Sequence, residues 1–154
     1  MTIDFFVSDA LKDGLDRIVE KTGSSKAQVV RDALGALKDY NEHKNEMQCD
    51  LWYEKQDESG LKIEAAAPEI DYIPLKKVHR ITLPENQKFR SDLRQYAKTY
   101  GKRMAQVLRD AVTYLVRYVD KLDEGYKLYS LKKGEDISKK VGVVLIGYHD
   151  LNKT

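Results

Sequence analysis

The chain carries one phrase twice: residues 27–37 read "AQVVRDALGAL" and residues 105–115 read "AQVLRDAVTYL". The two copies begin 78 residues apart, which is about half of the 154-residue chain. Each copy follows a glycine at the same distance, Gly23 in the first and Gly101 in the second. Repetition over so long an offset indicates two related structural units, one in each half of the chain.

Each unit opens with the pattern of a strand. Residues 78–83, "VHRITL", alternate between two sets of side chains, which predicts a strand with one buried face that ends at Pro84. Residues 3–8, "IDFFVS", alternate in the same way in the first unit. The faces expected to point outward carry Val78, Arg80 and Thr82 in the second unit, and Thr2, Asp4 and Phe6 in the first.

Two amphipathic helices follow each strand. In the second unit they are separated by Gly101, because glycine suits the left-handed conformation at the end of a helix. Gly23 takes this place in the first unit. Ser8 is suited to cap the first helix of that unit, and Ser25 begins a capping box for the second. The predicted order of each unit is therefore strand, helix, turn, helix.

A single short strand leaves its backbone donors and acceptors unpaired, so each unit needs a second strand. The two units can pair within one chain, or the second units of two chains can pair with each other. The strand charges favour pairing between chains, because it places two Arg80 side chains together. Both arrangements remain open from the sequence.

The ordered pattern resembles a known family. A strand ending in "ITLPE" (residues 81–85), a helix ending at glycine, then "GKRMAQVLRDAV" (residues 101–112) resembles the ribbon-helix-helix repressors of the Arc, MetJ and CopG type. The first copy, "GSSKAQVVRDAL" (residues 23–34), matches the last part, so the chain is most similar to tandem members such as TraY and archaeal-virus regulators.

The resemblance implies a mainly α fold with short β-strands. Two ribbon-helix-helix repeats are expected at residues 1–45 and 76–125. Each is followed by a small β-hairpin, within residues 46–75, which also hold a proline-containing linker, and within residues 126–154.

In this family two paired strands lie in the DNA major groove and the turns between helices bind phosphate. The resemblance thus implies base contacts by Val78, Arg80 and Thr82, with Arg80 suited to guanine O6 and N7. Phosphate contacts are implied for Lys76 and Lys77 beside the strand, for Lys102, Arg103 and Met104 in the second turn, and for Ser24, Ser25 and Lys26 in the first.

Charge is distributed unevenly between the halves. Residues 1–77 hold 11 Lys and Arg against 16 Asp and Glu, a net charge of −5, and residues 78–154 hold 16 against 9, a net charge of +7. An anionic partner is therefore expected to meet the second half. Asp4 would repel phosphate at the centre of the ribbon, so we expect the second unit to read DNA and the first mainly to support assembly.

Several classes of protein find no support in the sequence. It has no glycine-rich phosphate loop, no nucleophile with a recognisable base, and three histidines and one cysteine without metal-ligand spacing, so we expect neither an enzyme nor a metal or cofactor site. No apolar run approaches the ~20 residues that span a bilayer. The lone Cys49 fits a reducing compartment, the cytoplasm, or the host cytoplasm for a viral protein.

The sequence predicts a sequence-specific double-stranded DNA-binding transcriptional regulator of the repressor type, acting as a homodimer or a higher homo-oligomer. One alternative is an accessory factor for plasmid transfer or partition. Another is an antitoxin-like protein-interaction module whose acidic first half masks a partner.

Overall fold

The computed structural model describes residues 2–67, 78–84 and 86–145, and for Val78 the backbone only. The first half forms β1 (Thr2–Ser8), α1 (Asp9–Thr22), α2 (Lys26–Asn41), a π-helical turn η1 (Glu42–Glu46), β2 (Cys49–Asp57) and β3 (Gly60–Ala65). The second half forms β4 (Val78–Pro84), α3 (Gln87–Thr99), α4 (Met104–Asp123), β5 (Lys127–Lys132), a 3₁₀ turn η2 (Ile137–Lys139) and β6 (Val141–Gly142).

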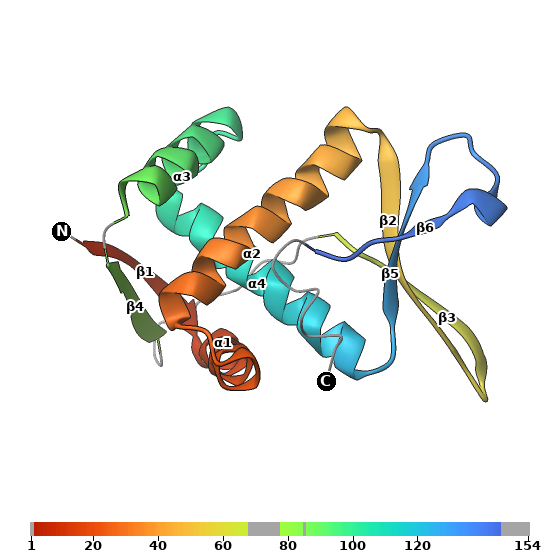
Figure 1. Ribbon diagram of the computed structural model, residues 1–154, viewed down its shortest axis with the longest axis horizontal. Helices are drawn as coiled ribbons and strands as arrows, with labels where there is room; N and C mark the ends of the chain where they lie inside the picture. The colour runs from red at the N-terminus through yellow and green to blue at the C-terminus, as the bar shows by residue number, and fades with distance from the viewer. Residues whose placement is uncertain (1, 68–77, 85, 146–154) are drawn as a thin grey trace.

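The strands form two antiparallel sheets at opposite ends of the molecule. β1 pairs with β4 in a two-stranded ribbon, and a second sheet has the order β3-β2-β5-β6. Figure 1 shows α2 and α4 crossing between the ribbon and this second sheet. Among the described helices, none is long and apolar enough to cross a lipid bilayer.

The fold class predicted from the sequence is wrong. The described residues form four α-helices and six strands in two antiparallel sheets, an α/β arrangement rather than a mainly helical chain of two ribbon-helix-helix repeats with separate hairpins. The physical reason lies in β2 and β5, which pair with each other and set Trp52 opposite Tyr129. The two expected hairpins therefore share one four-stranded sheet.

The pairing of β1 with β4 occurs within one chain. This differs from the pairing between chains that the strand charges favoured. Ile3 lies opposite Leu83 and Phe5 opposite Ile81, so the ribbon has a continuous apolar inner face. This inner face is covered by the helices, and within a chain it needs no second copy to be buried.

Helix boundaries follow from local capping. Ser8 Oγ accepts a hydrogen bond from the Leu11 N–H (3.2 Å) and begins α1, and Ser25 Oγ accepts from the Gln28 N–H (3.1 Å) and begins α2. Gly23 ends α1 with φ of 70°, a left-handed conformation that glycine adopts without steric cost. Both predicted caps and this helix end are confirmed.

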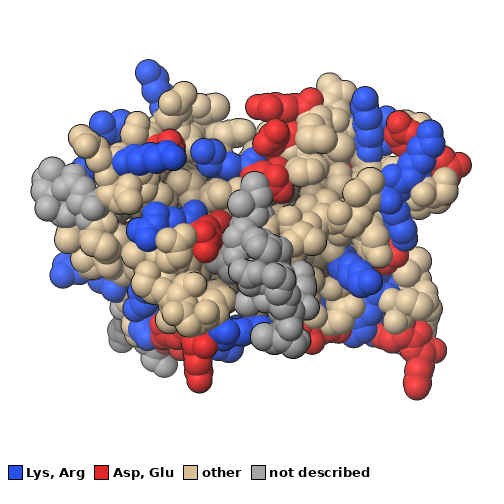
Figure 2. Space-filling view, in the orientation of Figure 1, with Lys and Arg blue, Asp and Glu red and all other residues tan. Residues whose placement is uncertain are grey.

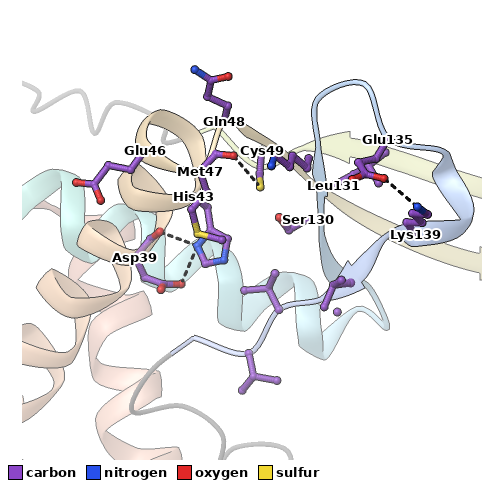
Figure 3. Close-up of a pocket in the computed structure, with 15 residues that line it drawn as sticks. Asp39, His43, Glu46, Met47, Gln48, Cys49, Ser130, Leu131, Glu135 and Lys139 are labelled. Atoms are coloured by element: carbon purple, nitrogen blue, oxygen red, sulfur yellow. Dashed lines mark hydrogen bonds and ion pairs between the residues drawn. The ribbon is translucent and has the colours of Figure 1, made fainter.

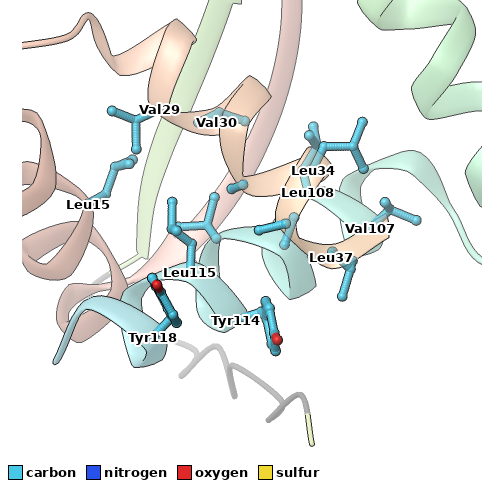
Figure 4. Close-up of a cluster of buried hydrophobic side chains, with 14 of the residues drawn as sticks. Leu15, Val29, Val30, Leu34, Leu37, Val107, Leu108, Tyr114, Leu115 and Tyr118 are labelled. Carbon is cyan, nitrogen blue, oxygen red and sulfur yellow. The ribbon is translucent and has the colours of Figure 1, made fainter. Parts of the chain in front are cut away.

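The core is centred on the crossing of α2 with α4. Apolar side chains of both helices interlock there (Figure 4), and the tyrosine rings of Tyr40 and Tyr114 meet edge to face with centroids 5.2 Å apart. Complete burial of one leucine or valine side chain in this core contributes about 1.5–3 kcal/mol to the free energy of folding. The central members are Leu15, Val29, Val30, Leu34, Leu37, Val107, Leu108, Leu115 and Tyr118.

α1 packs closely against α4. A Cβ atom added to Gly14 would lie 2.5 Å from Val116 Cγ1, so only glycine permits this approach. At the end of the same contact, Lys21 Nζ lies 2.5 Å from Asp123 Oδ1 and Arg17 lies 3.2 Å from Asp120. The first helix of one half is thereby fixed to the second helix of the other.

Candidate nucleic-acid interface

The outer face of the β1–β4 ribbon is the surface that the sequence predicted to face DNA. Exposed and buried residues alternate along both strands, with Arg80 and Thr82 exposed and Ile81 buried between them. The predicted strand register is therefore confirmed. Val78 lies in β4 opposite Ser8, but its side chain is outside the described part of the structure.

Side chains of both strands share this face. Phe6 lies directly opposite Arg80, and Asp4 directly opposite Thr82. Phe6 is 45% exposed, an unusual position for a large aromatic side chain. The sequence predicts that the second unit reads DNA and the first mainly supports assembly, and the structure places Asp4 and Phe6 of the first unit on the same face as Arg80.

The ribbon is anchored to the body of the protein by a polar contact as well as by its apolar face. His79 Nε2 hydrogen-bonds with Asp9 Oδ1, which joins the start of β4 to the first turn of α1. This contact fixes the strand whose next residue is Arg80. The side chain of Arg80 therefore projects from a strand that pairs with β1 and is also bonded to α1.

The two turns between helices differ in how they use their donors. In the first, Thr22 Oγ1 accepts from the Ser24 N–H (3.2 Å) and Ser25 caps α2. In the second, the Lys102 N–H donates to Ala97 O (2.9 Å), and Arg103 occupies the N-cap of α4 without a side-chain cap. The first N–H groups of α4 thus lack the side-chain acceptor that Ser25 supplies to α2.

The repeated phrase builds the same polar chain in both units. Arg31 donates to Gln28 Oε1 (2.9 Å), and Gln28 Nε2 donates to Asp32 Oδ1 (2.9 Å). In the second unit Arg109, Gln106 and Asp110 repeat these contacts at 2.6 and 2.7 Å. The polar residues that the two copies share therefore have a structural role. Their spacing of three and four residues on one helix is a signal that could have predicted it.

Lys102 takes part in this chain in the second unit. Its Nζ lies 2.8 Å from Asp110 Oδ2, and Asp110 is 7% exposed. The sequence predicted Lys102 to bind phosphate, whereas the structure pairs it with a buried carboxylate. The first unit has Ser24 in the place of Lys102, and burial raises the pKa of the equivalent carboxyl group, Asp32.

The other predicted phosphate-binding residues have different positions. Arg103 is exposed beside the start of α4, whereas Met104 and Lys26 are half-buried as the first residues of α4 and α2. Lys76 and Lys77 lie outside the described residues.

A basic surface on α3 was not singled out in the sequence. Figure 2 shows Lys and Arg at both ends of this face, with Asp and Glu near the end of α2 and η1 between them. The exposed cations of α3 are Lys88, Arg94 and Lys98.

A pocket of about 900 Å³ lies at the opposite end, between η1, β2, β5 and residues 141–144 (Figure 3). His43 Nδ1 lies 2.9 Å from Asp39 O, and burial raises the pKa of the Asp39 carboxyl group. Cys49 also lines the pocket and is buried. Acidic, basic and apolar side chains line this pocket.

No family model, curated protein or solved structure matches the chain.

Proposed function

We propose that this protein is a sequence-specific double-stranded DNA-binding transcriptional regulator that inserts the β1–β4 ribbon into the major groove. The observation that supports this best is the ribbon itself: an antiparallel pair with an apolar face in the core and a polar face in solvent. The major groove is wide enough to admit a two-stranded ribbon.

The exposed side chains suit the reading of bases. The Arg80 guanidinium can donate two hydrogen bonds to guanine O6 and N7, and Thr82 can bond a base edge or contact a thymine methyl group. Asp4 can accept from cytosine N4, and Phe6 can cover a thymine methyl group. Val78, at the start of the same strand, would add an apolar contact. The ribbon reads few base pairs, so flanking contacts must position it.

Phosphate contacts are proposed for the turns on either side. The first N–H groups of α4, which lack a side-chain cap, and the exposed Arg103 can hold a phosphate. The turn formed by Ser24, Ser25 and Lys26 is the weaker site, because the N–H groups of Ser24 and Gln28 already donate to Thr22 and Ser25. Met104 would contribute its backbone N–H. Lys102 would reach phosphate only by leaving Asp110, so we assign the larger electrostatic contribution to Arg103.

The proposal includes a homo-oligomer acting in the cytoplasm. The cytoplasmic location is supported by Cys49, which is a buried free thiol, as is usual in reducing compartments.

Selection from random double-stranded DNA, followed by gel-shift titration, tests the proposal. The wild-type protein is expected to enrich one sequence, and Arg80→Ala to lose the preference for guanine at one position, a loss of about 1–3 kcal/mol in discrimination. Arg103→Ala is expected to weaken binding to all sequences alike. Lys127→Ala, which removes an exposed charge on the distant sheet, serves as the control and should change neither property.

Two results would contradict DNA reading by the ribbon. One is unchanged sequence preference in Arg80→Ala. The other is the absence of DNA binding by the wild-type protein at low salt, where phosphate contacts are strongest. Capture of a protein partner that persists above ~0.5 M salt would instead favour the protein-interaction module.

A further inference from the structure

β3 is an outer strand of the four-stranded sheet. Within the described residues, β2 is the one strand that pairs with it. Figure 1 shows the β2–β3 hairpin extending away from the helices, at the end of the molecule opposite the ribbon. An outer strand presents backbone N–H and C=O groups that another strand can pair.

The backbone groups at this open edge follow from the register. The Ala66 N–H donates to Leu51 O of β2 at 3.3 Å. Residues bonded to the same neighbour recur at every second position of an antiparallel strand. The residues between them direct their N–H and C=O groups to the open edge, and these residues are Leu61, Ile63 and Ala65.

The side chains at this edge are apolar and exposed. Leu61 is 56% exposed and Ile63 is 58% exposed, although both belong to a regular strand. Lys and Glu occupy the alternate positions: Lys62 Nζ lies 3.1 Å from Asp57 Oδ2, and Glu64 lies 2.5 Å from Lys121 Nζ. Both charged side chains thus lie on the face opposite Leu61 and Ile63 and have partners within their own chain, and no described strand covers the outer edge of β3.

We infer that β3 pairs antiparallel with β3 of a second copy of this chain, about a two-fold axis at Ile63. Ile63 then lies opposite the partner's Ile63, and Leu61 opposite the partner's Ala65. All three edge residues enter hydrogen-bonded pairs. On the other face, Lys62 lies opposite the partner's Glu64, and Glu64 opposite the partner's Lys62. A two-fold contact of this kind closes on itself and forms a dimer.

The charges select this register and this partner. A shift of two residues in one direction sets Lys62 against the partner's Lys62. The same shift in the other direction sets Glu64 against the partner's Glu64. Like charges directly opposite each other destabilise a strand pair, and opposite charges stabilise it. The strand is thus complementary to itself in one arrangement.

This inference assigns a surface to the homo-oligomer in the proposed function and rests on that part of it. DNA binding plays no role in the pairing, so the test uses DNA-free protein. Failure of DNA binding would leave the test unaffected. A monomeric wild-type protein would likewise not decide whether Arg80 contacts bases, which the gel-shift titration of Arg80→Ala measures separately.

The mass of the protein in solution, measured by sedimentation velocity over a range of concentrations, provides the test. The wild-type protein is expected to shift from 17.8 kDa toward twice that mass as its concentration rises. Ile63→Lys places two ammonium groups at the axis and is expected to weaken the dimer at least about tenfold. Ile137→Lys alters a residue that is 60% exposed but lies outside the sheet, and should have no effect.

Charge exchange tests the register. Lys62→Glu and Glu64→Lys are each expected to weaken self-association, because like charges then face each other and each variant also opposes Asp57 or Lys121 of its own chain. An equimolar mixture of the two variants is expected to associate more strongly than either alone, because opposite charges face each other in the mixed dimer while the contacts within each chain are the same as in the single variants. A wild-type protein that stays at 17.8 kDa at every concentration would overturn the inference, as would a dimer that survives Ile63→Lys. A mixture that associates no more strongly than the single variants would refute the register. Circular dichroism of each variant confirms that the fold is retained.

Discussion

Replacement of Asp110 by alanine measures how much the repeated polar chain stabilises the fold. The Asp110 carboxylate is 7% exposed and accepts from Gln106 Nε2 at 2.7 Å and from Lys102 Nζ at 2.8 Å. A hydrogen bond to a charged group contributes about 1.5–3 kcal/mol. The Lys102 pair adds about 0.5–1 kcal/mol, because its ammonium group is half exposed. We expect Asp110→Ala to lower the free energy of unfolding by about 2–4 kcal/mol.

The first unit supplies a matched control at the equivalent position. Asp32 accepts one such bond, from Gln28 Nε2 at 2.9 Å, and burial raises the pKa of its carboxyl group, so its ionised form is less favourable in the fold. Asp32→Ala is expected to cost about 1 kcal/mol or less. Urea unfolding followed by circular dichroism at pH 7 measures both losses, and each kcal/mol corresponds to roughly 2–4 °C in Tm.

A third variant separates the two contacts of Asp110. Lys102→Met removes the ion pair and keeps the bond from Gln106, and should account for about 0.5–1 kcal/mol of the loss. Unchanged stability in Lys102→Met would show that the contact with Lys102 contributes nothing. A loss below about 0.5 kcal/mol in Asp110→Ala would refute a structural role for the repeated chain.

Four further predictions concern the packing and the pKa shifts. Gly14→Ala should destabilise by about 1–2 kcal/mol, because its Cβ would clash with Val116, and Val116→Ala should partly restore stability in a thermal melt. Because the pKa of Asp32 is raised in the fold, the wild type should lose stability relative to Asp32→Asn as pH rises above about 4, in urea titrations at several pH values. Bonds from Ser59 and Lys62 lower the pKa of Asp57 to about 2, so their stabilisation is present above about pH 4 and lost toward pH 2; the Tm of Asp57→Asn should fall less over that interval. Tyr114→Phe should leave stability unchanged or raise it by about 1 kcal/mol, because the buried Tyr114 hydroxyl has no partner among the described residues; a clear loss in urea unfolding would contradict this.

The parts of the fold that depend on chain neighbours were predictable from the sequence. Alternation over residues 78–83 placed Arg80 outside and Ile81 inside, because successive side chains of a strand point to opposite faces. Ser8 and Ser25 were recognisable as caps because a hydroxyl at that position reaches the N–H three residues ahead.

The four-stranded sheet was not predictable in this way. Each later segment shows an apolar strand, a polar turn and a second strand, and this pattern is satisfied locally by a hairpin. The pairing of Trp52 with Tyr129 joins residues far apart in the sequence, and no local pattern records it. The same non-local contact made the fold class differ from the expected one.

The candidate interface was predictable in its strand and less so in its turns. Lys102 was expected to meet phosphate, but its partner Asp110 lies between one and two helical turns beyond the N-terminus of α4, and only the folded turn brings the two together. Arg94 and Lys98 were within reach of sequence reasoning, because two cations four residues apart on a helix share one face. The resemblance implies DNA contacts by the strand and the turns, and it assigns none to this helix.

The exchange of strands between the two halves affects how the chain is made. When β1 and β2 leave the ribosome, their mates β4 and β5 have not been translated, and at usual elongation rates the 78-residue interval lasts roughly 4–16 s. During that time the nascent first half carries strand edges without partners, the state most open to wrong association. Such a chain depends on continuous synthesis: a pause between its halves prolongs exposure, and a product truncated there is a substrate for chaperones and proteases.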